Sequence, residues 1–142
     1  MRNIFVTSLL TINILAVAVA QQSANIEFLK QYNGKYSYEV KLFNNAVIKQ
    51  RLQKLLGAQF NYLVKSIWQV ETPIKVENNF VYAWAMQAHS GGDPAATLLA
   101  DISKNILYVK IVKGNQTKIY SEDGSNTVPK ELEDWAKKQI SN

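Results

Sequence analysis

Residues 79–88, NFVYAWAMQA, decide the fold of this chain. Large and small side chains alternate along this stretch: Phe80, Tyr82, Trp84 and Met86 against Val81, Ala83, Ala85 and Gln87. Successive side chains of a β-strand point to opposite faces of a sheet, so a period of two is typical of a strand. The stretch therefore predicts a β-strand with one deeply buried face.

Three further segments with strand character follow, at residues 95–102, 106–112 and 117–121. The link at residues 103–105 has the length of a hairpin loop, and residues 113–116, KGNQ, form a second turn signal. Together with the first strand, these segments predict a four-stranded antiparallel meander.

Helical patterns precede the strands. Residues 44–59 bring apolar side chains to one face at a period of 3.6 residues. Asn44 or Asn45 is suited to cap the start of this helix, and Gly57 is suited to end it. Residues 60–68 repeat the pattern and predict a second short helix, with a strand as the alternative because of their aromatic content.

The two ends of the chain add further elements. Residues 128–140 predict a closing helix, because acidic side chains lie near its start and lysines lie near its end. Residues 26–32 suit a short helix, and residues 36–42 suit a strand or an extended arm. The order of elements predicts an α+β fold, with an antiparallel sheet of about four to five strands and helices packed on one side.

Residues 1–20 have the layout of a secretory signal peptide. A basic residue precedes an apolar run that ends in AVA at residues 18–20, which matches an A-x-A cleavage site. The run is shorter than the ~20 apolar residues that a membrane span needs. We expect cleavage after Ala20 and a single exported domain at residues 21–142, periplasmic in a Gram-negative source and secreted otherwise.

The charge of the chain is moderately positive. Sixteen basic and 11 acidic side chains give a formal net charge of +5, and loss of Arg2 with the signal peptide lowers it to +4. The lysines form no run of three, which favours a solvated surface over a nucleic-acid interface. We therefore expect no nucleic-acid partner, and no membrane partner after signal cleavage.

Catalytic and metal-binding residues are scarce. The chain has no cysteine, which excludes thiol chemistry and disulfides, and His89 is its only histidine. No serine has the G-x-S-x-G context of a nucleophile elbow. A zinc site needs three or four ligands, and His89, Asp93 and Asp101 are a poor set. We expect no enzyme activity, no metal and no cofactor.

His89 belongs to the loop at residues 86–94, MQAHSGGDP, which links the first two strands of the meander. Gly91 and Gly92 have no side chains, so the backbone can bend sharply and a partner can approach closely. Pro94 fixes the exit of the loop. These residues predict either a stiffened, protruding loop with an imidazole near its tip or an ordinary exposed turn.

Several stretches form a recognisable pattern. They are LLGAQFNYLVKSIWQVETPIKV at residues 55–76, the aromatic strand, MQAHSGGD at residues 86–93, the hairpin strands, and Trp135-Ala136. From about Asn45 onward, this pattern resembles the Ivy family of periplasmic inhibitors of vertebrate lysozyme. In that family the loop reads C-x-x-H-x-C, and a disulfide closes it.

The resemblance implies a function and a partner. In the Ivy family the protruding loop enters the cleft of a lysozyme, and its histidine bonds with the catalytic carboxylates. The corresponding partner-binding residues here are Gln87, Ala88, His89, Ser90, Gly91, Gly92 and Asp93. The implied partner is a lysozyme or another glycoside hydrolase, and the resemblance also permits a homodimer.

The chain departs from the family pattern at the disulfide. Met86 and Gly91 stand at the two cysteine positions. A disulfide that closes a six-residue loop is worth about 2 kcal/mol. Without it, binding carries more of the cost of ordering the loop. Pro94 and the Gly91-Gly92 turn are expected to supply part of the missing stiffness.

Two questions stay open at this level. Aromatic residues in the predicted sheet favour an alternative function as a non-inhibitory cell-envelope binding module: Tyr82, Trp84, Tyr108 and Tyr120. The class of target is also open. Vertebrate lysozymes are cationic, as is this chain, so long-range electrostatics disfavour their encounter. This favours another class of lysozyme or another glycan-cleaving enzyme.

Overall fold

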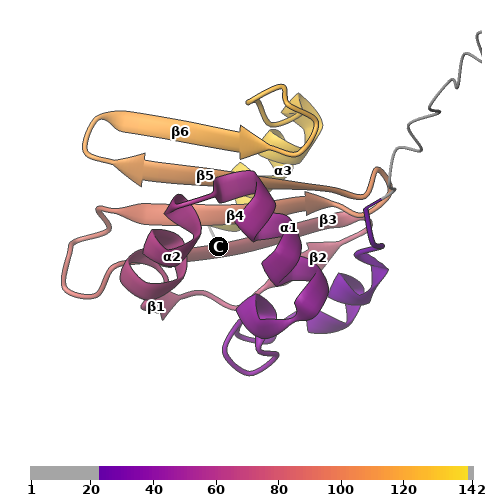
Figure 1. Cartoon of the computed structure of the whole chain (residues 1–142), viewed down its shortest axis with the longest axis horizontal. Helices are drawn as coiled ribbons and strands as arrows, with labels where there is room; N and C mark the ends of the chain where they lie inside the picture. Colours follow the sequence, from indigo (N-terminus) through magenta and orange to yellow (C-terminus); the bar gives the residue numbers. More distant parts are fainter. Residues whose placement is uncertain (1–22, 141–142) are drawn as a thin grey trace, which may run out of the picture.

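The computed structural model describes residues 23–140, which form one antiparallel sheet with helices on both faces (Figure 1). The elements in chain order are η1 (Glu27–Tyr32), η2 (Leu42–Asn44), α1 (Ala46–Leu56), α2 (Gln59–Tyr62), the π-helical η3 (Leu63–Ile67), β1 (Val70–Glu71), β2 (Lys75–Glu77), β3 (Phe80–Met86), β4 (Ala95–Asp101), β5 (Ile106–Lys113), β6 (Gln116–Ser121) and α3 (Lys130–Ile140). None of these helices combines the length and the hydropathy that a membrane span requires. The predicted signal peptide, residues 1–20, lies outside the described residues.

The predicted meander is confirmed as β3, β4, β5 and β6, which pair antiparallel in sequence order. The strands β5 and β6 meet at Lys113 and Gln116, so Gly114 and Asn115 alone make the turn between them. Gly114 has a φ of 58°. A positive φ is what the favoured two-residue hairpin turns require, and glycine adopts it without steric cost.

A split edge strand extends the sheet beyond the prediction. β1 and β2 both pair with the outer edge of β3, opposite Ala85–Met86 and Phe80–Tyr82 respectively. Pro73 lies between them and has no N–H to give to a ladder, so the edge strand breaks there. Each piece is too short to show a period of two. Asn78, with a φ of 55°, helps to turn the chain from β2 into β3.

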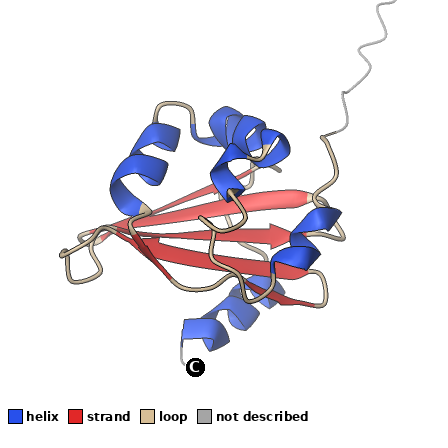
Figure 2. Ribbon diagram, turned by 90° about the horizontal axis from the view of Figure 1, so that it is seen from below, coloured by secondary structure: helices blue, strands red, loops and turns tan. Residues whose placement is uncertain are grey.

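The helices that precede the sheet cover one of its faces (Figure 2). The side chain of Asn45 caps α1 by accepting bonds from Val47 N and Ile48 N at 3.0 and 3.2 Å. The predicted end at Gly57 is confirmed, with a φ of 55°. The deeply buried face of β3 is the one with small side chains, because small residues let the helices approach the sheet closely. The segment predicted at residues 60–68 is helical, as α2 and η3.

The α+β class and the antiparallel sheet are confirmed, but α3 corrects the expectation that the helices share one side. Figure 2 shows α3 on the opposite face from α1 and α2. Leu132 and Ala136 of α3 pack there with Tyr82, Leu99 and Tyr108. The large side chains of β3 point to this face, and α3 removes much of their apolar surface from water.

The expectation of a strand or an extended arm at residues 36–42 is wrong. The segment forms tight turns that lead into η2, with Leu42 N donating to Ser37 O at 2.9 Å. Tyr36 N donates to a carboxylate oxygen of Glu39 at 2.7 Å. Such local side-chain acceptors offer the backbone an alternative to a sheet ladder. The short helix predicted at residues 26–32 is confirmed as η1.

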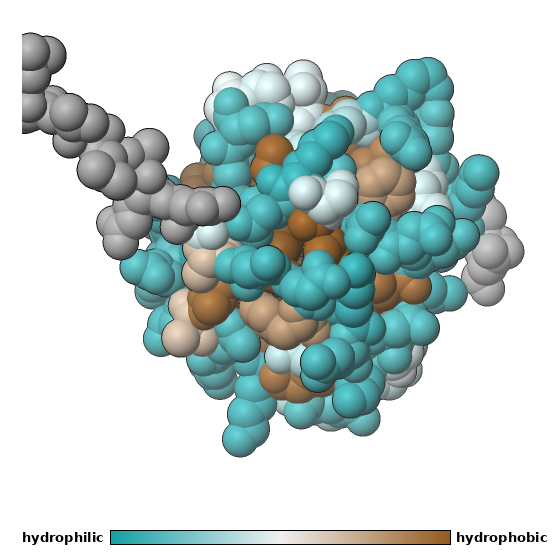
Figure 3. Space-filling view, turned by 90° about the vertical axis from the view of Figure 1, so that its right-hand side faces the viewer, coloured by the Kyte–Doolittle hydropathy of each residue, from teal (hydrophilic) through white to brown (hydrophobic). Residues whose placement is uncertain are grey.

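Arg51 of α1 ties the helix to the turn between β4 and β5. Figure 3 looks onto this end of the sheet, where hydrophilic side chains predominate. The guanidinium is buried, and its five N–H groups meet five acceptors: Glu122 Oε1 and Oε2, Asn105 Oδ1 and O, and Ala24 O. Asn105 lies in the turn between β4 and β5, and Glu122 follows β6. One side chain therefore joins α1 to three segments that are distant in the sequence.

Tyr108→Phe is expected to raise the free energy of unfolding at pH 7 by about 1 kcal/mol. The Tyr108 hydroxyl is buried without a hydrogen-bond partner among residues 23–140. Burial, followed by nearby Asp123, Asp101 and Glu122, raises the pKa of Tyr108 to about 12. Because the phenol ionises earlier in the unfolded chain, wild-type stability falls as the pH rises from about 10 to 12, and the variant loses less. Urea denaturation of wild type and variant at pH 7 and again above pH 10 checks this. A variant that is less stable than wild type at pH 7 would contradict it.

Candidate functional site

The loop of residues 87–93 joins β3 to β4 and protrudes at one end of the sheet (Figure 1). His89 and Gly91 are exposed. The φ angles of His89, Gly91 and Gly92 are positive, at 56°, 68° and 92°. Three left-handed residues within four positions coil the backbone into a compact turn. Histidine is among the non-glycine residues that accept this conformation most often.

Short contacts close the base of the loop. Gln87 N donates to Pro94 O at 3.1 Å, and the Ser90 hydroxyl donates to Gln87 O at 2.6 Å. A Cβ atom placed on Gly92 would lie 3.9 Å from Met86 Sδ. The thioether of Met86, at the first cysteine position of the family pattern, therefore lies against the loop.

The carboxylate of Asp93 fastens the loop to the neighbouring hairpin. Both of its oxygens lie 2.9 Å from Gly114 N, which donates to them. Gly114 begins the turn between β5 and β6, and Figure 1 shows this turn at the same end of the sheet as the loop. Hydrogen bonds to an ionised group are about twice as strong as neutral ones. This contact holds the C-terminal side of the loop.

Gln69, which directly precedes β1, holds the N-terminal side. Its Oε1 accepts a hydrogen bond from Ala88 N at 2.9 Å, and its Nε2 donates to Lys65 O at 3.3 Å. Gln69 N also donates to Met86 O at 3.3 Å. Gln69 was not among the predicted site residues. Its place within the segment that resembles the Ivy family was the only signal in the sequence.

The predicted loop residues divide by what their side chains contact. Ser90 and Asp93 bond to backbone atoms of the protein itself. Gly91 and Gly92 have no side chains, so only their backbone N–H and C=O groups can contact a partner. His89 presents an exposed imidazole, which can donate or accept a hydrogen bond. The arrangement therefore offers one chemically versatile group on a backbone that is held from two sides.

Two exposed lysines belong to the segments that hold the loop. The backbone carbonyl of Lys65 accepts a hydrogen bond from Gln69, and Lys113 directly precedes Gly114. The Lys113 ammonium lies 5.5 Å from the centre of the Tyr62 ring, a cation–π contact. Among residues 23–140, no group of three or more histidine, aspartate or glutamate side chains is placed to hold a metal ion.

Asp93→Asn is expected to lower the free energy of unfolding by about 1 kcal/mol and to speed hydrogen exchange at the Gly114 amide. The amide side chain keeps one acceptor but loses the negative charge that strengthens the bond. The measurement is exchange by NMR, with Asp134→Asn on the exposed surface of α3 as the control. Equal exchange at Gly114 in wild type and Asp93→Asn would show that Asp93 does not hold the turn.

The fold and the loop together define a class of protein, a small α+β protein with a stiffened, histidine-bearing loop at one end of its sheet. A comparison with protein families matches residues 47–142 to the family described as inhibitor of vertebrate lysozyme (Ivy). The chain therefore belongs to the Ivy family, which makes lysozyme inhibition its general function and a lysozyme its kind of partner. No curated protein and no solved structure matches the chain. The matched residues include all of α1 except its first residue, the whole sheet, the loop and α3.

Proposed function

We propose that this protein inhibits a lysozyme, or a related glycan-cleaving enzyme, by placing the loop of residues 87–93 in the active-site cleft. The observation that carries the proposal is the exposed His89 on a loop held by Asp93 and Gln69. Lysozymes act through two carboxyl groups on either side of the scissile bond. An imidazole between these groups donates a hydrogen bond to one of them and excludes the glycan.

The contacts of Asp93 and Gln69 take the place of the family disulfide. Each is a hydrogen bond that crosses to another element, and such bonds contribute about 0.5–3 kcal/mol, depending on charge. Their combined effect is comparable to the ~2 kcal/mol of a disulfide around so short a loop. Because the loop is already ordered in the free protein, binding loses less conformational entropy. Preorganisation in this chain does not depend on an oxidising compartment.

The electrostatics of the loop end favour an acidic cleft. Lys65 and Lys113 belong to the segments that hold the loop, and the one carboxylate within the loop, Asp93, is bonded to Gly114. Local positive charge is complementary to catalytic carboxylates and sets the orientation of encounter. The net positive charge of the chain still slows its approach to a strongly cationic lysozyme. We therefore propose a target whose overall surface is less cationic than that of the vertebrate enzymes.

The alternative function as an envelope binding module loses most of its proposed surface. Tyr82 and Tyr108 belong to the core beneath α3. Tyr120 packs with the separate cluster on the other face of the sheet. Of these four aromatic residues, Trp84 alone lies half-buried on the α3 face. Because these aromatic rings do not form one continuous surface, inhibition is the better supported function.

Export remains part of the proposal. A lysozyme acts on cell walls, so its inhibitor must leave the cytoplasm, which agrees with cleavage after Ala20. A single domain at residues 21–142 and a homodimer also stay predictions. N-terminal sequencing of the protein from the exported fraction checks the cleavage site, and a chain that begins at Met1 would contradict it.

The proposed function is tested by the lysis of bacterial cell walls by lysozymes of several classes, with and without the protein. We expect inhibition of at least one class. We also expect a chito-oligosaccharide that fills the cleft to compete with the protein. If the oligosaccharide leaves the degree of inhibition unchanged, occlusion of the cleft is contradicted. If the protein inhibits no class of lysozyme, the proposed function is contradicted.

A further inference from the structure

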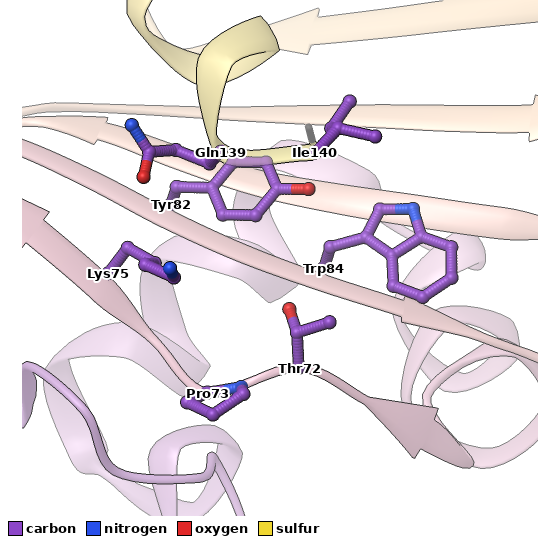
Figure 4. Close-up of a pocket in the computed structure, with 7 residues that line it drawn as sticks. All are labelled: Thr72, Pro73, Lys75, Tyr82, Trp84, Gln139 and Ile140. Atoms are coloured by element: carbon purple, nitrogen blue, oxygen red, sulfur yellow. The ribbon is translucent and has the colours of Figure 1, made fainter. Parts of the chain in front are cut away.

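A second candidate site lies on the α3 face of the sheet, away from the loop (Figure 4). It is a pocket of about 450 Å³ lined by Thr72, Pro73, Lys75, Tyr82, Trp84, Gln139 and Ile140. Small-molecule sites have volumes of ~300–1,000 Å³, with apolar walls and a few polar groups. The proposed inhibition uses none of these residues, so the pocket has no role yet.

The walls of the pocket offer flat apolar surfaces. Figure 4 shows the rings of Tyr82 and Trp84 on the same side of β3, with Ile140 reaching in from the end of α3. The other two indoles of the protein donate their N–H groups to protein acceptors, Trp68 to Ser37 and Trp135 to Glu77. Trp84 has no such bond within the described residues. Its half-buried ring can pack against the C–H face of a ligand ring.

The charge of the pocket is positive. Lys75 is its only charged lining residue, and the Lys75 ammonium forms no ion pair within residues 23–140. Lys138 directly precedes the two lining residues of α3 and offsets the negative end of the helix dipole, whereas Lys137 pairs with Glu133 at 3.5 Å. An anionic ligand is therefore favoured over a neutral or cationic one.

The remaining polar groups of the pocket include both donors and an acceptor. Thr72 Oγ1 is buried and has no hydrogen-bond partner in the described part of the chain, and an unpaired buried hydroxyl calls for an explanation. The Tyr82 hydroxyl is protonated at neutral pH, as tyrosine hydroxyls ordinarily are, and burial raises its pKa further, to about 12. The Nε2 group of Gln139 donates a hydrogen bond to Trp135 O, and its Oε1 can accept one from a ligand hydroxyl. The pocket suits a ligand that is rich in oxygen.

We propose that this pocket binds an acidic sugar, a pyranose ring that carries a carboxylate. The C–H face of the ring packs on Trp84, and the carboxylate pairs with Lys75. The hydroxyls of the sugar bond with Thr72 and Gln139. This combination uses the aromatic surface, the single cation and the uncharged polar groups of the pocket at once. The site is separate from the loop and goes beyond inhibition.

The test follows the indole N–H signal of Trp84 by NMR, assigned with Trp84→Phe, during titration with N-acetylmuramic acid. We expect a saturable shift. N-acetylglucosamine, which has a similar ring without the carboxylate, is expected to bind about tenfold more weakly, as is usual when a charge-assisted hydrogen bond is lost. Benzoate, a carboxylate on a ring that is not a sugar, is also expected to bind more weakly. No shift with N-acetylmuramic acid, or equal binding of either comparison ligand, would overturn the proposal.

A pair of lysine variants tests the role of Lys75. Lys75→Gln is expected to weaken binding of N-acetylmuramic acid about tenfold. Lys49→Gln removes the same charge from the exposed side of α1 and is expected to leave binding unchanged. Equal binding by the two variants would overturn the assignment of Lys75. Both variants are expected to keep the inhibition of lysozyme, so a failure of the sugar site stays distinguishable from a failure of the proposed function.

Discussion

Arg51→Met is expected to lower the free energy of unfolding by about 3–5 kcal/mol, the cost of breaking a buried ion pair from one side. Arg51 is 7% exposed, and the side chain of Glu122 is 18% exposed. Methionine fills the volume but leaves the Glu122 carboxylate without its cation. It also leaves the acceptors of Asn105 and Ala24 without their donors. Most single domains have a total stability of ~5–15 kcal/mol, so this one change removes a large share.

The controls separate geometry from charge. Arg51→Lys keeps the charge but cannot supply a planar fork of five donors, so it is expected to recover only part of the loss. Lys54→Met alters an exposed residue of the same helix and is expected to change stability by less than about 0.5 kcal/mol. Chemical denaturation measures all three. A loss below about 1 kcal/mol for Arg51→Met would show that the network does not hold α1 to the sheet.

The parts of the fold that the sequence predicts are those with a local cause. The alternation in β3 and the 3.6-residue period of α1 are visible within one segment, and both predictions are confirmed. The face that α3 covers depends on contacts of Leu132 with Tyr82 and Tyr108, which no single segment reveals. The split edge strand is too short to carry a period. Its position depends on pairing with β3.

The candidate site shows the same division. His89 and the glycines were identifiable from composition and from the family pattern. The contacts that hold the loop join residues far apart in sequence, since Ala88 and Gln69 are 19 residues apart and Gly114 and Asp93 are 21 apart. The Arg51–Glu122 pair spans 71 residues. Such contacts cannot be predicted from residue spacing or periodicity, because the partners come together only when the chain folds.

His89→Asn is expected to weaken inhibition of the target lysozyme about 10- to 150-fold. This range corresponds to the ~1.5–3 kcal/mol of a hydrogen bond to a charged group. Asparagine tolerates the left-handed conformation that His89 adopts, so the loop backbone keeps its shape while the imidazole is removed. Its shorter amide can occupy the position of the imidazole Nδ1 but does not reach that of Nε2, the nitrogen at the tip of the ring. The loss therefore reports on the side chain rather than on the turn.

Asn78→Ala provides the matched control. Asn78 lies in the turn at the other end of β3 and has a φ of 55°, against 56° for His89. Alanine accepts the left-handed conformation less readily than asparagine, so this variant perturbs an exposed turn that is not part of the proposed interface. This variant is expected to inhibit as well as wild type does, despite a small loss of stability.

The most direct test of the loop as the inhibitory element is therefore the inhibition constant of wild type, His89→Asn and Asn78→Ala against the lysozyme class that the wild type inhibits. Occlusion of the cleft by His89 predicts a constant at least ten times higher for His89→Asn and an unchanged constant for Asn78→Ala. Equal inhibition by wild type and His89→Asn would contradict the account and would place the inhibitory surface elsewhere on the protein.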